Sequence, residues 1–471
     1  MSANLNIRKA AFINGIGKYL KILLTLVVNA ILARLLSPSD FGITAVVTVF
    51  TTFFSYFSDM GLGPAIIQKK NLDDRDMNSI YTFSVYISIL LTICFFGLAY
   101  LIADFYNNSV YIGLSQLLSV SLLFNALNMV PNGLLNREKK FATIAIRTVV
   151  VYFFASVITI FLAIKGFKYY SLAIQAILTS VFTYIWNIRS VKVKFVFKVR
   201  YSSIKKILSF SSYQLAFNVV NYFSRNLDNL LTGKFMGSSE LGYYDKAYTL
   251  MLYPVNNLTG VVSPVLLPIL ADFQDDKKLI YVKYMKVVKM LSCIGVLVAP
   301  LCFFAAPEIV GILYGSGWNS TIKCFQIFSI AIIPQMINAS AGAVYQALDK
   351  TKLLFLNSCI NTGITVISIL IGIFIGGNIV SLSWCVAISY VVQFLSAFYM
   401  LIVYAFELDF LMFVKYLLPE FILLLIIAIS TSFYFFQISN IFLSFALKFL
   451  YIFIIYLIVM FFSKEYKFFI N

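Results

Sequence analysis

A short segment of this chain recurs in altered form 200 positions further on. Residues 34–42 read Arg-Leu-Leu-Ser-Pro-Ser-Asp-Phe-Gly, and residues 234–242 read Lys-Phe-Met-Gly-Ser-Ser-Glu-Leu-Gly. The same offset pairs Pro64 with Pro264. A direct repeat inside a very apolar chain predicts two similar bundles of membrane helices. Many transporters place their substrate site between two such halves.

The composition places this repeat in a membrane protein. Of the 471 residues, 61% are hydrophobic and 12% are charged, about half the charged fraction of soluble domains. We predict an all-α polytopic membrane protein with about 14 transmembrane helices, in two pseudo-symmetric six-helix lobes and a C-terminal helix pair. The expected spans are 12–35, 41–67, 78–103, 110–134, 141–164, 170–187, 208–235, 241–270, 284–305, 322–347, 353–376, 379–406, 413–435 and 441–462.

Lysine and arginine lie mostly in alternate loops between these spans. If the N-terminus is cytoplasmic, 24 loop cations face the cytoplasm and five face outside, so both termini are predicted to lie in the cytoplasm. This pattern explains the net charge of +17 without nucleic acid. The expected domains are an N-terminal lobe (1–187), a basic cytoplasmic linker (188–207), a C-terminal lobe (208–406) and an extra helix pair with a tail (407–471).

The sequence gives little support to catalysis. Histidine is absent, the six cysteines include no C-x-x-C pair, and no G-x-x-x-x-G-K-[ST] segment occurs. The longest external loop, near residues 307–321, is too short for an external catalytic domain. We therefore predict a protein that is not an enzyme and that uses no metal and no cofactor.

Two equivalent helices of the repeat carry polar side chains at membrane depth. In each helix these side chains recur every three or four residues, with Asn229 directly after Asp228 in the second helix, and so share one face. The two sets are Asn14, Lys18, Lys21, Thr25 and Asn29, and Asn218, Asn221, Arg225, Asp228 and Asn229. Because a charge at bilayer depth costs about 2.5–3.5 kcal/mol on insertion scales, we expect both faces to line one wet cavity.

The cations of these faces are the candidates for substrate contact. At 1.5 Å per residue, Lys21 lies about 22 Å and Lys18 about 27 Å below the outer end of the first span. An excess of positive charge predicts an anionic, phosphate-bearing ligand. The expected substrate-binding residues are Lys18, Lys21, Arg225, Asn221 and Lys246.

Other roles stay open for several charges. Lys18 is long enough to reach the cytoplasmic headgroups, and Arg147 is expected to be an interfacial anchor at the inner end of its span. Arg225 and Asp228 are spaced for an ion pair within one helix. Asp228 and Asp59 are the carboxylates expected to bind a coupling ion or to serve in structural pairs.

Glycine and proline mark the expected hinges. The segment Asp59-Met-Gly-Leu-Gly-Pro64 ends the second span, and Pro264, with two further prolines, is expected to interrupt the eighth. Such breaks persist in lipid where protein or water satisfies the freed carbonyls. Gly61, Gly63, Pro64 and Pro264 are therefore the candidate hinges for alternating access, with a static packing kink as the alternative.

Several segments resemble a known family, the bacterial polysaccharide flippases (Wzx-type) of capsule, O-antigen and exopolysaccharide pathways. This family belongs to the multidrug/oligosaccharidyl-lipid/polysaccharide exporter superfamily. The similarity extends to about residue 410, and its most specific part is the Ser-Pro-Ser-Asp-Phe-Gly run. The segments are 30–42, 58–69, 224–237, 241–248 and 261–270.

The resemblance implies two six-helix lobes around a cationic cavity, in a bacterial cytoplasmic (inner) membrane. The implied activity is flipping of a polyprenyl-pyrophosphate-linked oligosaccharide from the cytoplasmic to the periplasmic leaflet. Its partners would be this substrate, membrane lipids and a downstream polymerase. Two alternatives stay open: a cation-coupled multidrug exporter of the same superfamily, and a flippase for the peptidoglycan lipid precursor.

Overall fold

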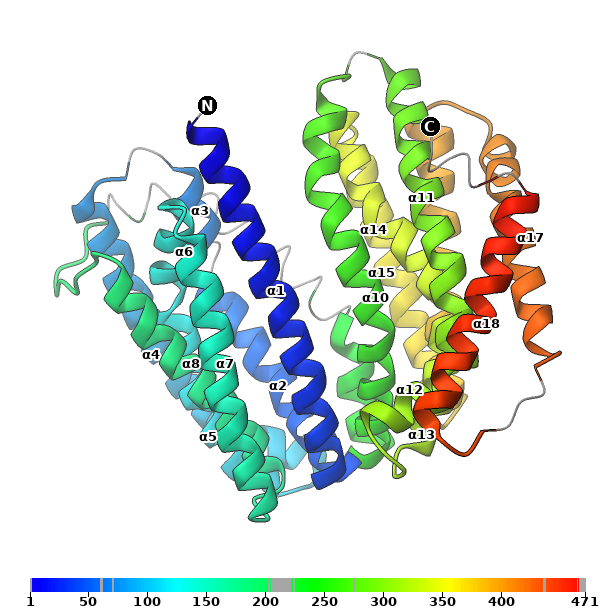
Figure 1. Cartoon of the computed structure of the whole chain (residues 1–471). Helices are drawn as coiled ribbons and strands as arrows, with labels where there is room; N and C mark the ends of the chain where they lie inside the picture. Colours follow the sequence, from blue (N-terminus) through cyan, green and yellow to red (C-terminus); the bar gives the residue numbers. More distant parts are fainter. Residues whose placement is uncertain are drawn as a thin grey trace. The chain divides into compact units, whose positions relative to one another are not determined.

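The computed structural model describes residues 2–59, 62–69, 72–201, 204, 222, 225–274, 276–434, 438–463 and 465, and their regular secondary structure is helical (Figure 1). The first helices are α1 (Ser2–Leu35), α2 (Pro38–Asp59), α3 (Leu62–Gln68), α4 (Asp74–Tyr106), α5 (Val110–Leu127), α6 (Met129–Arg137), α7 (Phe141–Ile164) and α8 (Tyr169–Ser190). Residues 225–235 are also helical. The later helices are α10 (Ser238–Ala271), α11 (Lys277–Phe304), α12 (Ala306–Leu313), α13 (Asn319–Ser329), α14 (Ile332–Ala347), α15 (Thr351–Phe374), α16 (Ile379–Tyr399), the π-helix η1 (Met400–Ala405), α17 (Phe410–Thr431) and α18 (Ile441–Phe462).

Contacts divide the chain into two compact units, Met1–Gly242 and Tyr243–Asn471. Residues 208–242 belong to the second repeat by sequence but to the first unit by contact. The domain boundaries predicted from the sequence repeat and the boundary between the two compact units therefore differ. The predicted domains remain a prediction from the repeat.

Most of the described helices overlap the predicted spans, but the described residues do not account for all 14 expected spans. In the described residues, eleven helices are long and apolar enough to cross a membrane, and the pair α13–α14, bent by 55°, would make twelve. The expected total of about 14 is not confirmed. The helix α10 does not qualify, and most of the predicted span 208–235 lies outside the described residues.

Three predicted spans each consist of two helices, and the second helix always has proline as its third residue. These prolines are Pro64 in α3, Pro131 in α6 and Pro334 in α14. Proline lacks an N–H and its ring clashes with the carbonyl four residues earlier, so it disfavours continuation of the preceding helix. In the first turn of a new helix no N–H partner is required. The break expected after Asp59 is therefore present.

The helix α10 behaves differently. It continues as one helix through Pro254, Pro264 and Pro268, so the expected interruption at these prolines was wrong. Helices α11 and α17 likewise contain Pro300 and Pro419. Within packed membrane helices, neighbouring groups and local adjustments satisfy the carbonyls that proline leaves free.

The start of α2 is fixed by a reciprocal cap in which Ser37 and Asp40 bond to each other's backbone. Ser37 donates from its backbone N–H and from Oγ to Asp40 Oδ2, over 2.9 and 2.7 Å, and the Asp40 N–H donates to Ser37 Oγ over 3.2 Å. Pro38 occupies the first helical position, where its missing N–H costs nothing. Asp40 Oδ1 also accepts the N–H of Tyr169 at the start of α8. The Ser-Pro-Ser-Asp run is thus a helix cap that also ties α2 to α8.

The two copies of the repeated segment touch each other within the first unit. Ser39 Oγ lies 2.7 Å from Ser238 Oγ. A Cβ atom on Gly42 would overlap the carbonyl oxygen of Ser238, and one on Gly242 would overlap that of Pro38. Positions 38 and 42 align with 238 and 242 in the repeat, so the contact has approximate two-fold symmetry. Only glycine permits this approach of backbone to backbone.

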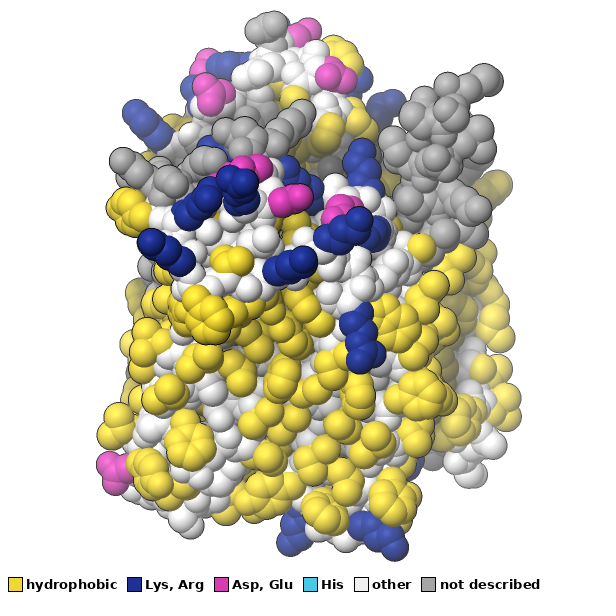
Figure 2. Space-filling model, turned by 90° about the vertical axis from the view of Figure 1, so that its left-hand side faces the viewer, with side chains coloured by type: hydrophobic (Ala, Val, Ile, Leu, Met, Phe, Trp, Pro, Cys, Tyr) yellow, Lys and Arg dark blue, Asp and Glu magenta, His cyan; other side chains and the backbone are white. Residues whose placement is uncertain are grey.

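One face of the first unit has the surface expected of a protein in contact with lipid hydrocarbon. Figure 2 shows a broad hydrophobic belt on this face, with most of the visible lysine and arginine side chains above it and others below and within it. The exposed side chains of this unit include apolar residues of α4 and α7, such as Ile93, Leu101 and Phe154. Such a surface is stable where lipid, rather than water, covers it.

The basic linker is anchored at its start. Residues 191–200 run without helix beside α4. The backbone N–H groups of Lys194 and Val196 donate to the side chains of Asn78 and Thr82, over 2.8 and 2.9 Å. The linker thus has defined anchor points on α4.

Candidate functional site

The polar face of α1 exposes Lys18 and Lys21. At 100° per residue, these lysines share one side of the helix with Thr25 and Asn29. Four of the exposed apolar side chains of α1 project from the opposite side, namely Ile16, Leu20, Leu23 and Val27. The two lysines therefore do not share the apolar surface of their own helix.

Helix α7 sets the orientation of this face. A Cβ atom on Gly17 would come within 2.7 Å of the Ala145 Cβ, so glycine lets α1 and α7 approach closely. Thr25 Oγ1 donates to the carbonyl of Lys21 over 2.8 Å. With Gly17 held against α7, Lys18 and Lys21 are directed to one side of the first unit.

In the helical residues 225–235, Arg225 and Asp228 have different surroundings. Arg225 is exposed, whereas Asp228 is 4% exposed and accepts the N–H of Asn229 over 2.8 Å. The Tyr106 hydroxyl of α4 donates to the carbonyl of Leu230 over 3.0 Å. Arg225 is thus open to a ligand, while Asp228 is enclosed. Asn221 lies outside the described residues.

Lys246 lies in the second unit, near the start of α10. It is 8% exposed, and its Nζ lies 5.8 Å from the ring centroid of Tyr314. A lysine over an aromatic ring at this distance makes a stabilising cation–π contact. The structure therefore buries Lys246, unlike Lys18 and Lys21, and its role in substrate binding remains a prediction.

The candidate hinges are described in part. Gly61 and the side chains of Asp59, Pro64 and Pro264 lie outside the described residues. Gly63 lies in the first turn of α3, where a Cβ atom on Gly133 of α6 would sit 3.4 Å from its Cα. The helices α3 and α6 thus pack against each other here at ordinary van der Waals distance, and the use of this region as a hinge remains a prediction.

Arg147 of α7 is 7% exposed, so the expectation of an interfacial anchor was wrong. Its Nη1 donates to Asn187 Oδ1 over 2.6 Å and to Asn132 Oδ1 over 3.3 Å. Asn187 Nδ2 in turn donates to Asn128 Oδ1 over 2.6 Å. This amide cluster joins α7 to α8 and to the start of α6. The asparagines inside apolar spans were the sequence feature from which this cluster could have been predicted.

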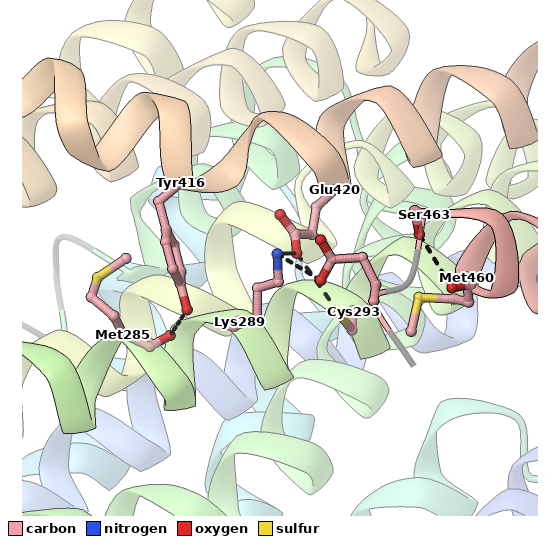
Figure 3. Close-up of polar contacts among 8 residues, drawn as sticks. Met285, Lys289, Cys293, Tyr416, Glu420, Met460 and Ser463 are labelled. Atoms are coloured by element: carbon pink, nitrogen blue, oxygen red, sulfur yellow. Dashed lines mark hydrogen bonds and ion pairs between the residues drawn. The ribbon is translucent and has the colours of Figure 1, made fainter. Parts of the chain in front are cut away.

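Two buried ion pairs in the second unit were also missed. Lys448 Nζ lies 2.7 Å from Glu308 Oε1. Lys289 Nζ lies 2.5 Å from Glu420 Oε1 (Figure 3). Lys448 is the only charge in its predicted span and Glu420 is the only acid in its own, which indicates partners on other helices. Over the described part of the chain, no group of three or more histidine, cysteine, aspartate or glutamate residues could hold a metal ion.

These features define a multi-span, all-helical membrane protein, and its fold matches solved transporters. The structure titled "Lipid II flippase MurJ, inward closed conformation" superimposes with a TM-score of 0.76 at 17% identity, over 96% of this chain and 99% of that one. An outward-facing multidrug resistance MATE family transporter of the MOP superfamily gives 0.53 at 14% identity, over 83% and 93%. At these identities the likeness shows a shared fold.

A family profile described as "Polysaccharide biosynthesis protein" matches residues 31–323, and the chain belongs to this family. The lipopolysaccharide biosynthesis protein WzxC of Escherichia coli (strain K12) is 25% identical, over 74% of this chain and 71% of that protein. The teichuronic acid biosynthesis protein TuaB of Bacillus subtilis (strain 168) is 24% identical, over 65% and 64%. The aligned region spans 71% and 64% of these two relatives. The resemblance seen in the sequence is confirmed.

Proposed function

We propose that this chain flips polyprenyl-pyrophosphate-linked oligosaccharides from the cytoplasmic to the periplasmic leaflet of a bacterial inner membrane. Membership of a polysaccharide biosynthesis family supports this class of cargo. A further relative, 22% identical over 61% of this chain, is the succinoglycan biosynthesis transport protein ExoT of Rhizobium meliloti (strain 1021). The observation that carries the proposal is the exposure of Lys18 and Lys21 on the polar face of a membrane helix.

The chemistry of the substrate explains these cations. An oligosaccharide headgroup crossing hydrocarbon unaided leaves many polar groups without hydrogen bonds. In the proposed complex, Lys21 binds the pyrophosphate as a point charge and Arg225 binds it through its planar fork. Lys18 adds positive charge one helical turn away, and polar side chains of the same faces meet the sugars.

Alternating access in this proposal follows the sequence repeat. The lobes 1–187 and 208–406 change conformation about Gly61, Gly63, Pro64 and Pro264, and both termini stay in the cytoplasm. The substrate keeps its covalent bonds throughout, and a downstream polymerase consumes the product.

The test of this function follows the lipid-linked precursor in cells that lack the chain. We expect the precursor to accumulate in the cytoplasmic leaflet, inaccessible to a glycan-modifying reagent added from outside. Normal delivery with altered drug sensitivity would contradict the proposal and indicate a multidrug exporter. Arrest of peptidoglycan synthesis, with normal export of other glycans, would contradict it in favour of a peptidoglycan-precursor flippase.

A further inference from the structure

The second unit contains two buried clusters of opposite charges, and they differ in net charge. In the first, Lys448 Nζ lies 2.7 Å from Glu308 Oε1, and the Ser444 hydroxyl donates to the same oxygen over 2.8 Å. One ammonium therefore meets one carboxylate, and this cluster is neutral. This neutral cluster is the reference with which the second cluster is compared.

The second cluster joins three segments of the C-terminal region (Figure 3). Lys289 of α11 lies 2.5 Å from Glu420 of α17 and 2.8 Å from Glu465, which follows α18. Lys289 is 7% exposed and Glu420 is 5% exposed, while the Glu465 side chain retains 18%. A single ammonium thus meets two carboxylates.

With both carboxylates ionised, this cluster would carry one uncompensated negative charge. The Glu420 Oε2 atom is buried and has no hydrogen-bond partner, as is also true of Glu308 Oε2 in the neutral cluster, so the two clusters differ in the number of carboxylates that meet the ammonium. The neighbouring core is apolar and includes Val296, Leu423 and Ile427. A buried charge without a partner is expensive, and two carboxylates at one site resist ionising together.

Among the described residues, the other groups in contact with the cluster supply no second positive charge. Cys293 Sγ of α11 lies 3.9 Å from Glu420 Oε1, and the Tyr416 ring of α17 lies 5.3 Å from Lys289 Nζ. Tyr456 of α18 packs against the adjoining apolar cluster. Thiol and phenol groups are neutral near pH 7. In the described residues, the ion pairs of Glu420 and Glu465 involve Lys289 alone.

We propose that the cluster of Lys289, Glu420 and Glu465 binds one exchangeable proton, carried by the two carboxylates. A proton fits better than a metal ion, because hard cations take several oxygen ligands and the neighbours here are sulfur and aromatic groups. The proton makes the cluster neutral and fastens the segment after α18 to α11 and α17. Its loss as pH rises leaves the two carboxylates repelling each other. Glu465, the more exposed of the two, then leaves the cluster.

Infrared difference spectroscopy of the purified full-length protein tests this site, because a protonated carboxyl has its own C=O band, which shifts in D₂O. We expect this band at neutral pH in the wild type and in Glu308→Gln, the matched control from the neutral cluster. The variants Glu420→Gln and Glu465→Gln are each expected to lose the contribution of one protonated carboxyl to this band. The variant Lys289→Gln is expected to gain one protonated carboxyl in this band, because each of the two carboxylates then takes up a proton.

An unchanged band in both glutamate variants would overturn the proposal. A band that disappears equally in Glu308→Gln would also overturn it, because that residue lies in a balanced pair. A sodium-dependent signal that replaces the proton signal would assign the site to a metal cation instead, and would equally contradict the proposal. The readout involves no transport, so failure here leaves the proposed flippase function intact.

Discussion

Replacement of Gly42 or Gly242 by alanine is expected to prevent accumulation of the folded protein. An added Cβ atom overlaps a carbonyl oxygen of the opposite repeat copy in both cases, and backbone cannot move aside as a flexible side chain can. Overpacking of this kind costs about 3 kcal/mol or more, a large part of the stability of a folded protein. Because the contact is symmetric, the two variants are expected to lose similar amounts.

The controls come from glycines of the same chain. Gly97 of α4 and Gly363 of α15 have open space where a Cβ would lie. Their replacement by alanine is expected to leave the melting temperature unchanged or to raise it, because alanine favours helix by about 1 kcal/mol. Thermal unfolding of the purified proteins measures both effects. Gly42→Ala and Gly242→Ala proteins as stable as the wild type would show that the two copies do not meet as described.

The second large effect concerns the exposed cations. The double variant Lys21→Gln/Arg225→Gln is expected to lose polysaccharide export at least about 100-fold, since each hydrogen bond to a charged group contributes about 1.5–3 kcal/mol. Both side chains are exposed, so the abundance of the protein is expected to stay normal. Export is measured as polymer at the cell surface and abundance by immunoblot.

The matched control for this variant is Lys165→Gln, an exposed lysine after α7 that belongs to neither polar face. It is expected to export normally. Lys21→Arg, which keeps the charge, is expected to retain part of the activity. Full export from the double variant at normal abundance would remove Lys21 and Arg225 from the substrate site.

The positions of the helices were predictable because the length of an apolar run directly reports a membrane crossing. The predicted range 141–164 is the helix α7, and 441–462 is α18. The breaks were less predictable. Pro131 and Pro334 each begin a new helix, whereas Pro254 and Pro268 lie inside α10. Whether proline breaks a helix depends on the neighbours that satisfy the freed carbonyls, and these are tertiary contacts.

The sequence could predict only those features of the site that lie within a single helix. The spacing of Lys18 and Lys21 within α1 placed them on one face, and both are exposed. Arg147 was misjudged because its partner Asn187 comes from another helix, 40 residues away. The pair of Lys289 and Glu420 is separated by more than a hundred residues. Pairings between distant helices leave no periodic pattern in the sequence.

The most direct measurement follows a labelled polyprenyl-pyrophosphate oligosaccharide between the two leaflets of vesicles that contain only the purified chain. We expect wild-type protein to bring the inner-leaflet label to a membrane-impermeant reagent outside. Vesicles with the Lys21→Gln/Arg225→Gln variant should behave like protein-free vesicles. Equal rates for wild type, variant and empty vesicles would contradict the proposed flipping of a phosphate-bearing lipid by these cations.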